Sequence, residues 1–338
     1  MPPLITVIIP TLEGGENLEK CLAALASQTF TRFEIIVVDN SGGAAGVPDG
    51  PAGGRVRVLR NETNAGFGAA VNQGIRAAGG ELICTLNDDA FPEPHWLEEL
   101  ASACAGDLSV GMCASQIRLA GAPERLDSAG MQVYLDGSSK QRGRMALAAD
   151  FSAREEVLFP SACAALYRVA MLEKIGGFDP DFFLYCEDTD LGLRARRAGF
   201  RCLYVPSAVV YHRYSGSAGR ASAAKAFYVE RNRLYTVIKN FPVWLWPAVP
   251  IFSAYRYGMH LYSLLAGRGL ASEFQRGSDP WWKLMKIVLA ANWQAFRHLP
   301  SLLAKRRRAA RLAAISGWAF LRLLRRHSIS ARDLALQP

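Results

Sequence analysis

Three carboxylates cluster where an apolar stretch of the sequence runs into a predicted helix. The stretch FFLYCEDTDLGLRARRAGF, residues 182–200, places Glu187, Asp188 and Asp190 after an aromatic run. Carboxylates repel one another, and burying one is unfavourable unless a partner compensates its charge. They are therefore either structural acids at a helix N-terminus, where the helix dipole favours negative charge, or they include a general base at the edge of a dry pocket. Arg194, Arg196 and Arg197 are expected to form a solvated helix face, and an ion pair between Arg194 and Asp190, four residues earlier, is the alternative.

A second polar group follows the hydrophobic run ELICTL. Asn87, Asp88 and Asp89 come directly after this predicted strand, so their side chains should project from the strand tip. Carboxylate oxygens are the ligands that Mg²⁺ and Mn²⁺ prefer, and such cations also bridge phosphate oxygens. The alternative is an ordinary turn leading into the next helix, where aspartate is common. His212 ends a later hydrophobic run, and by itself it fits a surface histidine at a strand end.

The glycine-rich stretch NAGFGAAVNQG, residues 64–74, opens another predicted helix. Backbone amides at a helix N-terminus bind phosphate groups well, so this stretch could face a diphosphate. It lacks the third glycine of the dinucleotide-binding fingerprint, because Val71 stands at that position. The alternative is that the glycines allow close packing of the helix against a neighbouring segment.

The elements that must position these residues alternate between strands and helices. Strands are predicted at residues 5–10, 33–40, 55–61, 81–89 and 202–212, and helices are predicted at 66–80, 93–106 and 190–199. Continuous β-branched runs such as ITVIIP are typical of strands buried on both faces of a parallel sheet. The fold class is therefore α/β, with an open, mostly parallel sheet that carries helices on both faces.

In such sheets, ligands bind beyond the carboxyl ends of the strands. Polar residues occur at four such ends, namely Thr11 with Glu13, Asp39 with Asn40, residues 87–89, and His212. If these strands lie side by side, the four groups converge on one crevice.

Net charge divides the chain into two parts. Residues 1–224 hold 20 Lys and Arg against 26 Asp and Glu, whereas residues 225–338 hold 19 against 4. An acidic soluble domain followed by a strongly basic region indicates different partners for the two parts. The seven cysteines are scattered without CxxC spacing, which favours reduced thiols in the cytoplasm over a zinc site or disulfides.

The basic region carries Trp, Tyr, Leu and Phe among its Lys and Arg residues at helical spacing. Prolines and Arg256 interrupt the apolar stretch 240–267, which disfavours a spanning helix. Residues 279–299 and 305–327 resemble helices that lie in a bilayer interface, and basic residues there would be attracted to an anionic surface. The alternative is a helical subdomain that buries its aromatic residues against the catalytic domain or a second copy of the chain. A nucleic-acid-binding function is disfavoured, because it would not need the acidic crevice.

Taken in order, these motifs resemble the inverting glycosyltransferases of family 2, which have the GT-A fold. The resemblance is strongest to bacterial rhamnosyltransferases and galactofuranosyltransferases of cell-surface polysaccharide synthesis, and it spans residues 4–233. It is carried by TVIIPT, VVDNS, NAGFGAAVNQG, LNDDA, GGFDPDFFLYCEDTDLGLRARRAGF and VPSAVVYHRYSGS. It implies a catalytic domain at 1–233, with a nucleotide-sugar half at about 1–115 and an acceptor half at about 116–233. A helical, membrane-associating region at 234–338 follows.

The resemblance also implies roles for individual residues. Donor-binding residues would be Pro10, Thr11, Glu13, Asp39, Asn40, Asn64, Gly66, Gly68, Asn72, Asn87 and Asp88. Asp39 would read a pyrimidine base, and residues 87–89 take the place of the DXD motif. Asp89 and His212 would bind Mg²⁺ or Mn²⁺, whereas Asn87 stands where the family has its first aspartate and is a weaker ligand.

Asp188 corresponds to the general base, and Glu187, Asp190 and Tyr185 would position the acceptor or support the base. The implied reaction moves a sugar from a nucleotide diphosphate to a glycan or polyprenyl-diphosphate-linked acceptor at the inner face of the cell membrane. Rhamnose from dTDP-rhamnose is our expected donor. Galactofuranosyl, glucosyl and N-acetylhexosaminyl transfer from UDP-sugars are alternatives, and a sugar-phosphate nucleotidyltransferase is a remote one.

Overall fold

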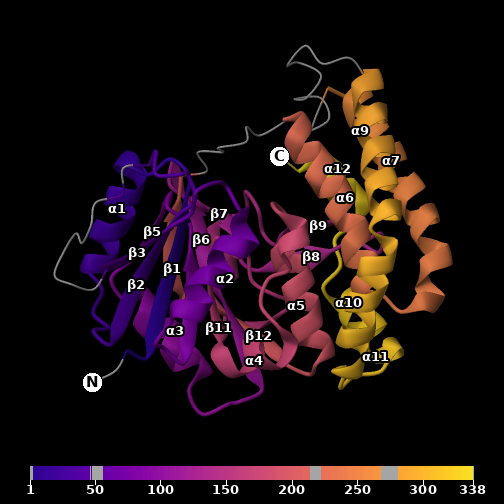
Figure 1. Cartoon of the computed structure of the whole chain (residues 1–338). Helices are drawn as coiled ribbons and strands as arrows, with labels where there is room; N and C mark the ends of the chain where they lie inside the picture. The colour runs from indigo at the N-terminus through magenta and orange to yellow at the C-terminus, as the bar shows by residue number, and fades with distance from the viewer. Residues whose placement is uncertain (1–2, 46, 48–55, 214–221, 268–280, 338) are drawn as a thin grey trace. The chain divides into compact units, whose positions relative to one another are not determined.

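The computed structural model describes residues 3–45, 47, 56–213, 222–267 and 281–337. The chain divides into two compact units. The first contains Met1–Met131 and Gln141–Tyr214, and the second contains Gln132–Lys140 and Ser215–Pro338. Figure 1 shows the elements of each unit.

A ten-stranded sheet forms the centre of the first unit, with the order β10-β12-β6-β11-β4-β1-β2-β3, while β5 pairs with β12 and β7 with β6. The strands are β1 Ile5–Thr11, β2 Phe33–Asp39, β3 Val56–Arg60, β4 Leu82–Leu86, β5 Ala90–Pro92, β6 Val110–Leu119, β7 Ala122–Ser128, β10 Glu155–Val157, β11 Ala164–Arg168 and β12 Arg201–His212. The side chains of β4 are all buried, as expected of a strand covered on both faces. The predicted α/β class with a mostly parallel sheet is confirmed.

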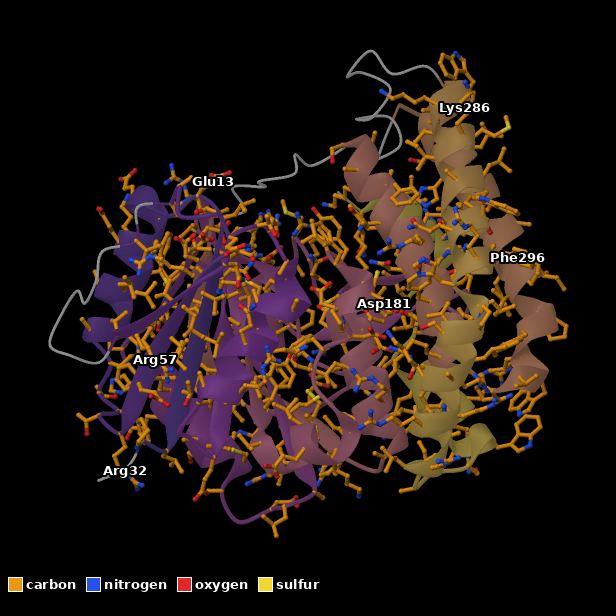
Figure 2. All side chains as sticks on the ribbon, in the orientation of Figure 1. Glu13, Arg32, Arg57, Asp181, Lys286 and Phe296 are labelled. Carbon is orange, nitrogen blue, oxygen red and sulfur yellow. The ribbon has the colours of Figure 1, made fainter. Side chains whose placement is uncertain are left out.

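The strand directions bring several strand ends to one edge of the sheet. Strands β3, β2, β1 and β4 are parallel, β11 runs antiparallel to both β4 and β6, and β12 is parallel to β6. The carboxyl ends of β1, β2, β4 and β12 therefore lie at the same edge as the amino end of β11. We call this the carboxyl edge. Glu13 lies just past it, whereas Arg32 lies at the opposite edge (Figure 2).

Helices cover both faces of this sheet. Helices α1 (Gly15–Ala26) and α3 (Trp96–Cys104) pack into one hydrophobic cluster with side chains of β1, β2 and β4. Helices α2 (Phe67–Ala77), α4 (Val169–Ile175) and α5 (Glu187–Arg197) cover the other face, together with the short 3₁₀ segments η1 (Ala148–Phe151) and η2 (Pro180–Phe182). Gly74 lets α2 approach closely, because a Cβ there would lie 2.5 Å from the Ile8 side chain.

The second unit is helical apart from residues 132–140, which belong to the small sheet of β8 (Met131–Val133) and β9 (Ser139–Gln141). Its described elements are α6 Ala223–Asn240, η3 Val243–Ala248, α7 Val249–Leu265, α9 Trp281–Arg297, α10 Leu299–Arg311, α11 Gly317–Arg326 and α12 Ala331–Leu336. Helix α6 packs against α9 and α10, and α7 packs against α12 (Figure 1). None of the helices in the described residues is both long and apolar enough to cross a membrane.

A buried network of charges holds the second unit together. Arg256 of α7 donates to Asp136 (2.6 Å) and to Glu230 of α6 (2.9 Å), and Arg233 also pairs with Glu230. Arg233 further donates to the Asp136 carbonyl oxygen (2.9 Å). Burial alone would raise the pKa of Asp136, but Arg256 and Arg233 hold it below its ordinary value. The turn between β8 and β9 is thus fixed to α6 and α7 by ionic contacts.

Replacing Asp136 by Asn tests this network, because the change removes the charge but keeps the shape. Two buried guanidinium groups then lose a compensating charge, and breaking such a buried pair costs about 3–5 kcal/mol. We expect Asp136→Asn to lower the free energy of unfolding in urea by that amount. Arg332→Ala, at an exposed position, is the control and should change it by less than about 0.5 kcal/mol. Equal stability of the two variants would show that the network does not stabilise the unit.

Candidate functional site

The strand ends at the carboxyl edge bring Thr11 and Asp88 into contact. The Thr11 hydroxyl donates to Asp88 Oδ2 (2.6 Å) and accepts the backbone amide of Gly14 (2.9 Å). Burial raises the pKa of Asp88 to about 6, the charges of Asp89 and Glu13 add to this rise, and the Thr11 hydrogen bond opposes it. Glu13 is exposed and Pro10 is half-buried at the same edge. Negative charge is therefore concentrated where β1 and β4 end.

Asp89 and His212 meet at this edge, as the sequence predicts for the ends of β4 and β12. His212 Nε2 lies 3.2 Å from Asp89 Oδ1, and its Nδ1 lies 2.8 Å from Asp127 Oδ2. All three side chains are buried. Burial disfavours the charged imidazole, but Cys163, Asp127 and Asp89 around the ring raise the pKa of His212 well above its ordinary value.

Asp127 was not among the predicted site residues. It lies in β7, is almost fully buried, and pairs with Arg144 as well as with His212. Burial favours its neutral form, yet His212 and Arg144 hold the pKa of Asp127 below its ordinary value. A carboxylate on Nδ1 fixes the orientation of an imidazole, so Asp127 directs His212 Nε2 toward Asp89.

Asp39 presents a buried acceptor at the end of β2. Its Oδ1 accepts the amide (3.0 Å) and the hydroxyl (2.6 Å) of Ser41. Its Oδ2 is buried and has no hydrogen-bond partner among the described residues. Buried polar atoms are rarely left unpaired in folded proteins, so this oxygen is suited to accept an N–H group from a ligand.

The asparagines that were predicted to bind the donor make contacts within the protein. Asn40 Nδ2 donates to Asn64 Oδ1 (2.9 Å), which also accepts the Gly66 amide (2.9 Å). Asn72 donates to the Phe178 carbonyl oxygen (2.7 Å) and accepts its amide (2.9 Å). These bonds fix the loop before α2 and join α2 to the segment after α4, and a donor contact for them stays a prediction.

Gly66 and Gly68 lie against the segment that leads to α5. A Cβ at Gly66 would lie 2.5 Å from the Phe183 carbonyl oxygen, and one at Gly68 would lie 3.0 Å from Phe178 Cβ. Gly66 also has a φ of +85°, which favours glycine. Both glycines thus permit close packing, which is the second interpretation of this stretch, and contact with a diphosphate stays a prediction.

Asp188 lies in the first turn of α5 and is half-buried. Its Oδ1 accepts the amide (2.6 Å) and the hydroxyl (3.2 Å) of Thr189, and its Oδ2 accepts the Ala162 amide at 3.4 Å. Burial raises the pKa of Asp188, and the amides of Thr189 and Ala162 oppose that rise. The carboxylate is therefore held in one orientation, with a pKa shifted toward neutrality.

Glu187 and Asp190 have different surroundings. Burial, followed by the charge of Asp188, raises the pKa of Glu187 to about 8. Asp190 is fully buried and accepts Arg194 Nε at 2.9 Å, which confirms the alternative of an ion pair. The expected solvated face is wrong for Arg194 and Arg196, because both side chains are buried. Arg194 in turn donates to the carbonyl oxygens of residues 175–177. Asp190 therefore braces the loop after α4 in this structure, and contact with an acceptor stays a prediction for both acids.

The loop before α5 has an unusual backbone. Phe183, Tyr185 and Cys186 have φ angles of 61°, 68° and 64°, in the left-handed region that non-glycine residues rarely adopt. The Phe183 carbonyl oxygen accepts the Phe67 amide at 2.9 Å, which ties this loop to α2. Backbone strain of this kind concentrates at functional sites, so the loop supports a specialised role for the start of α5.

One short segment joins the two groups of acids. The Ala162 amide binds Asp188, and the next residue, Cys163, accepts the Asn87 amide through its carbonyl oxygen (2.8 Å). The Cys163 thiol is also a hydrogen-bond neighbour of the His212 ring. Asp188 is therefore linked to the Asp89–His212 pair through two consecutive residues at the amino end of β11.

The sequence model of the family described as glycosyl transferase family 2 matches residues 6–176, just over half of the chain. The chain belongs to glycosyl transferase family 2. This glycosyltransferase is 32% identical over 253 residues to the N-acetylglucosaminyl-diphospho-decaprenol L-rhamnosyltransferase of Mycobacterium tuberculosis, an alignment that covers 66% of this chain and 80% of the relative. The family predicted from the motifs, and its relation to rhamnosyltransferases, are confirmed.

Two solved structures share its GT-A-like fold. One is GalNAc-T7 with UDP, GalNAc and Mn²⁺, with a TM-score of 0.54 and 16% identity, which covers 70% of this chain and 48% of that protein. The other is the mannosyltransferase PcManGT from Pyrobaculum calidifontis with GDP-Man and Mn²⁺, with a TM-score of 0.51 and 17% identity, which covers 94% and 88%. These similarities establish the fold of the glycosyltransferase.

Asn72→Ala tests whether the tie between α2 and the Phe178 segment stabilises the site. The change leaves a half-buried amide and carbonyl without their partner, which costs about 1–3 kcal/mol. We expect a corresponding loss in the free energy of unfolding in urea, whereas Arg76→Ala, on the exposed side of the same helix, should be neutral. Unchanged stability of Asn72→Ala would show that the side chain is not a structural tie.

Proposed function

We propose that this glycosyltransferase moves a sugar from a nucleoside diphosphate to an acceptor hydroxyl by a single displacement that inverts the anomeric carbon. Asp188 is the general base in this proposal. The observation that carries it is the segment Ala162–Cys163, which links the Asp188 carboxylate to the Asp89–His212 pair. A base and a phosphate-binding group must flank one sugar carbon, and this linkage supports that arrangement.

Rhamnose from dTDP-rhamnose is the donor we propose, on the similarity to the mycobacterial rhamnosyltransferase. The free Oδ2 of Asp39 supports a pyrimidine nucleotide, because thymine and uracil both carry a ring N–H that a carboxylate accepts. The same group does not separate dTDP from UDP, so galactofuranosyl, glucosyl and N-acetylhexosaminyl transfer are the alternatives. The acceptor we propose is a glycan or a polyprenyl-diphosphate-linked sugar.

The residues present fit a divalent cation. Two neighbouring ligands of an octahedral cation lie about 3 Å apart, and Asp89 Oδ1 and His212 Nε2 are separated by 3.2 Å. Among the described residues, no group of three or more His, Cys, Asp or Glu side chains is arranged to hold a metal ion. Asp89 and His212 would therefore share Mg²⁺ or Mn²⁺ with the diphosphate, and the cation would neutralise the charge that builds up there.

The chain itself supplies the proton acceptor. As the acceptor oxygen forms its bond to the anomeric carbon, the bond from that carbon to the diphosphate breaks and the hydroxyl proton passes to Asp188. The raised pKa of Asp188 brings its basicity closer to neutral pH. Residues 182–185 would wall the acceptor side and limit hydrolysis of the donor by water.

Product analysis on a panel of nucleotide sugars, with and without Mn²⁺, tests this function. We expect Mn²⁺-dependent release of nucleoside diphosphate, and release of pyrophosphate would instead indicate a nucleotidyltransferase. Asp188→Asn should lower turnover by about 100-fold or more while the donor still binds, because a positioned base contributes that much. Asp89→Ala should instead weaken Mn²⁺-dependent donor binding. Turnover of Asp188→Asn near the wild-type rate would show that Asp188 is not the base.

We also propose that the helical unit binds the inner face of the cell membrane. Helix α9 exposes Trp282, Met285, Leu289, Trp293 and Phe296, which are spaced so that they share one face. Lys286 lies 4.5 Å from the Trp282 ring, and Lys286 and Phe296 mark the course of α9 in Figure 2. Helices α7 and α9 contain no acidic residue, so a second copy would bring like charges together. An anionic lipid surface complements both the apolar face and the charge.

Replacing Leu289, Trp293 and Phe296 together by Ser tests this surface. All three are more than half exposed, so the fold should persist while the apolar face is lost. We expect about a tenfold or greater loss of co-sedimentation with vesicles that contain phosphatidylglycerol, because each side chain loses apolar burial in the interface. Leu108→Ser, at an exposed position in the first unit, is the control. Unchanged sedimentation of the triple variant would exclude α9 as the membrane contact.

A further inference from the structure

Three buried polar groups lie together beneath the first turn of α5. They are the hydroxyl groups of Thr85 on β4 and Tyr167 on β11, and the carboxyl oxygen Oε2 of Glu187. Their residues are 0%, 1% and 7% exposed, and apart from the contact between the two hydroxyls, which lowers the pKa of Tyr167, none of these three atoms has a hydrogen-bond partner among the described residues. Unpaired buried polar atoms are rare, so a cluster of three needs an explanation.

The sheet places the two hydroxyls on the face that α5 covers. Thr85 pairs with Ala165 in the antiparallel β4–β11 ladder, so Tyr167, two residues further along β11, projects from the same face as Thr85. The Tyr167 ring packs edge-on against Phe178, with centroids 5.7 Å apart. A Cβ at Gly68 would lie 3.0 Å from Phe178 and 3.8 Å from the Glu187 Cβ, so the same small space borders Glu187.

The hydrogen bonds of the two neighbouring carboxyl groups, Asp188 and Glu187, favour different protonation states. Asp188 accepts from the Thr189 amide, the Thr189 hydroxyl and the Ala162 amide, all of which favour its ionised form. Glu187 lacks these contacts, and a hydrogen bond with its own backbone amide offsets the effect of its burial only in part. Burial and the charge of Asp188 keep the pKa of Glu187 near 8, and burial together with Asp188 and Glu187 raises the pKa of Tyr167.

We propose that Glu187 is a positioning residue that stays protonated during transfer, with the Thr85 and Tyr167 hydroxyls as its polar surroundings, so that the negative charge resides on Asp188. The inference rests on the proposed role of Asp188. A charged Glu187 would repel the Asp188 carboxylate and favour its protonation, which would remove the base. A neutral Glu187 leaves Asp188 as the ionised member of the pair.

Protonation of Glu187 in the folded state has a consequence for stability that does not depend on activity. In the unfolded chain the group ionises near its ordinary pKa of 4.5, whereas in the folded protein it does so near 8. Between these values folding requires uptake of a proton, so the wild-type protein loses stability as pH rises through this window. Below this window Glu187 is protonated in both the folded and the unfolded chain, and above it Glu187 is ionised in both. Outside the window, Glu187 therefore no longer makes the free energy of unfolding depend on pH.

The variant Glu187→Gln tests the inference, because glutamine is a permanently neutral mimic of the protonated acid. We expect Glu187→Gln to lose far less turnover at pH 7 than Asp188→Asn, which loses about 100-fold or more. The melting temperature of Glu187→Gln relative to wild type should rise by several degrees between pH 5 and pH 8.

Two results would overturn the inference. The first is a loss of turnover in Glu187→Gln as large as that in Asp188→Asn, which would make Glu187 itself essential as a charged group. The second is a melting difference between Glu187→Gln and wild type that stays constant from pH 5 to pH 8. High turnover of Asp188→Asn would instead contradict the proposed function, so the two failures are distinguishable.

Discussion

The reversed direction of β11 is the constraint on which the rest of the site depends. Because β11 runs antiparallel between β4 and β6, its amino end lies at the edge where β1, β4 and β12 finish. That amino end supplies Ala162, which holds Asp188, and Cys163, which contacts Asn87 and His212. A parallel strand in this place would carry these residues to the far edge, and the groups that we propose as base and metal site would not be neighbours.

The carboxylates near this edge have different partners that offset the cost of their burial, and these differences suit the acids to different roles. The pairs are Asp89 with His212, Asp127 with His212 and Arg144, Asp190 with Arg194, Asp88 with the Thr11 hydroxyl, and Asp188 with two backbone amides. Acids with a cationic partner stay ionised and rigid. Asp188 combines a raised pKa with partial exposure, which is the combination a general base needs. Glu187 has no cationic partner among the described residues, and its own backbone amide offsets its burial only in part, so in our proposal a bound proton supplies the remaining compensation.

Much of the framework could be predicted from the sequence, because it depends on local patterns. The β-branched runs predicted the parallel strands, and the positions at strand ends predicted that Asp89 and His212 lie together. The four-residue spacing allowed the Asp190–Arg194 pair but did not distinguish it from a solvated helix face. Long-range partners could not be predicted. Asp127 lies 85 residues from His212 in a stretch with no clear strand pattern, and Asp136 lies 120 residues from Arg256. For donor and acceptor contacts, the asparagine and glycine motifs were compatible with both ligand binding and packing. The structure gives them packing partners, and their ligand contacts stay predictions.

The anomeric configuration of the product tests the central claim most directly. If Asp188 deprotonates the acceptor on one side of the sugar carbon while the diphosphate leaves from the other, bond formation and bond breakage occur on opposite faces. Proton NMR of the first glycoside formed, compared with the nucleotide sugar that the protein turns over, reports this configuration before any mutarotation. The account predicts an inverted anomeric centre, and a retained configuration would contradict it.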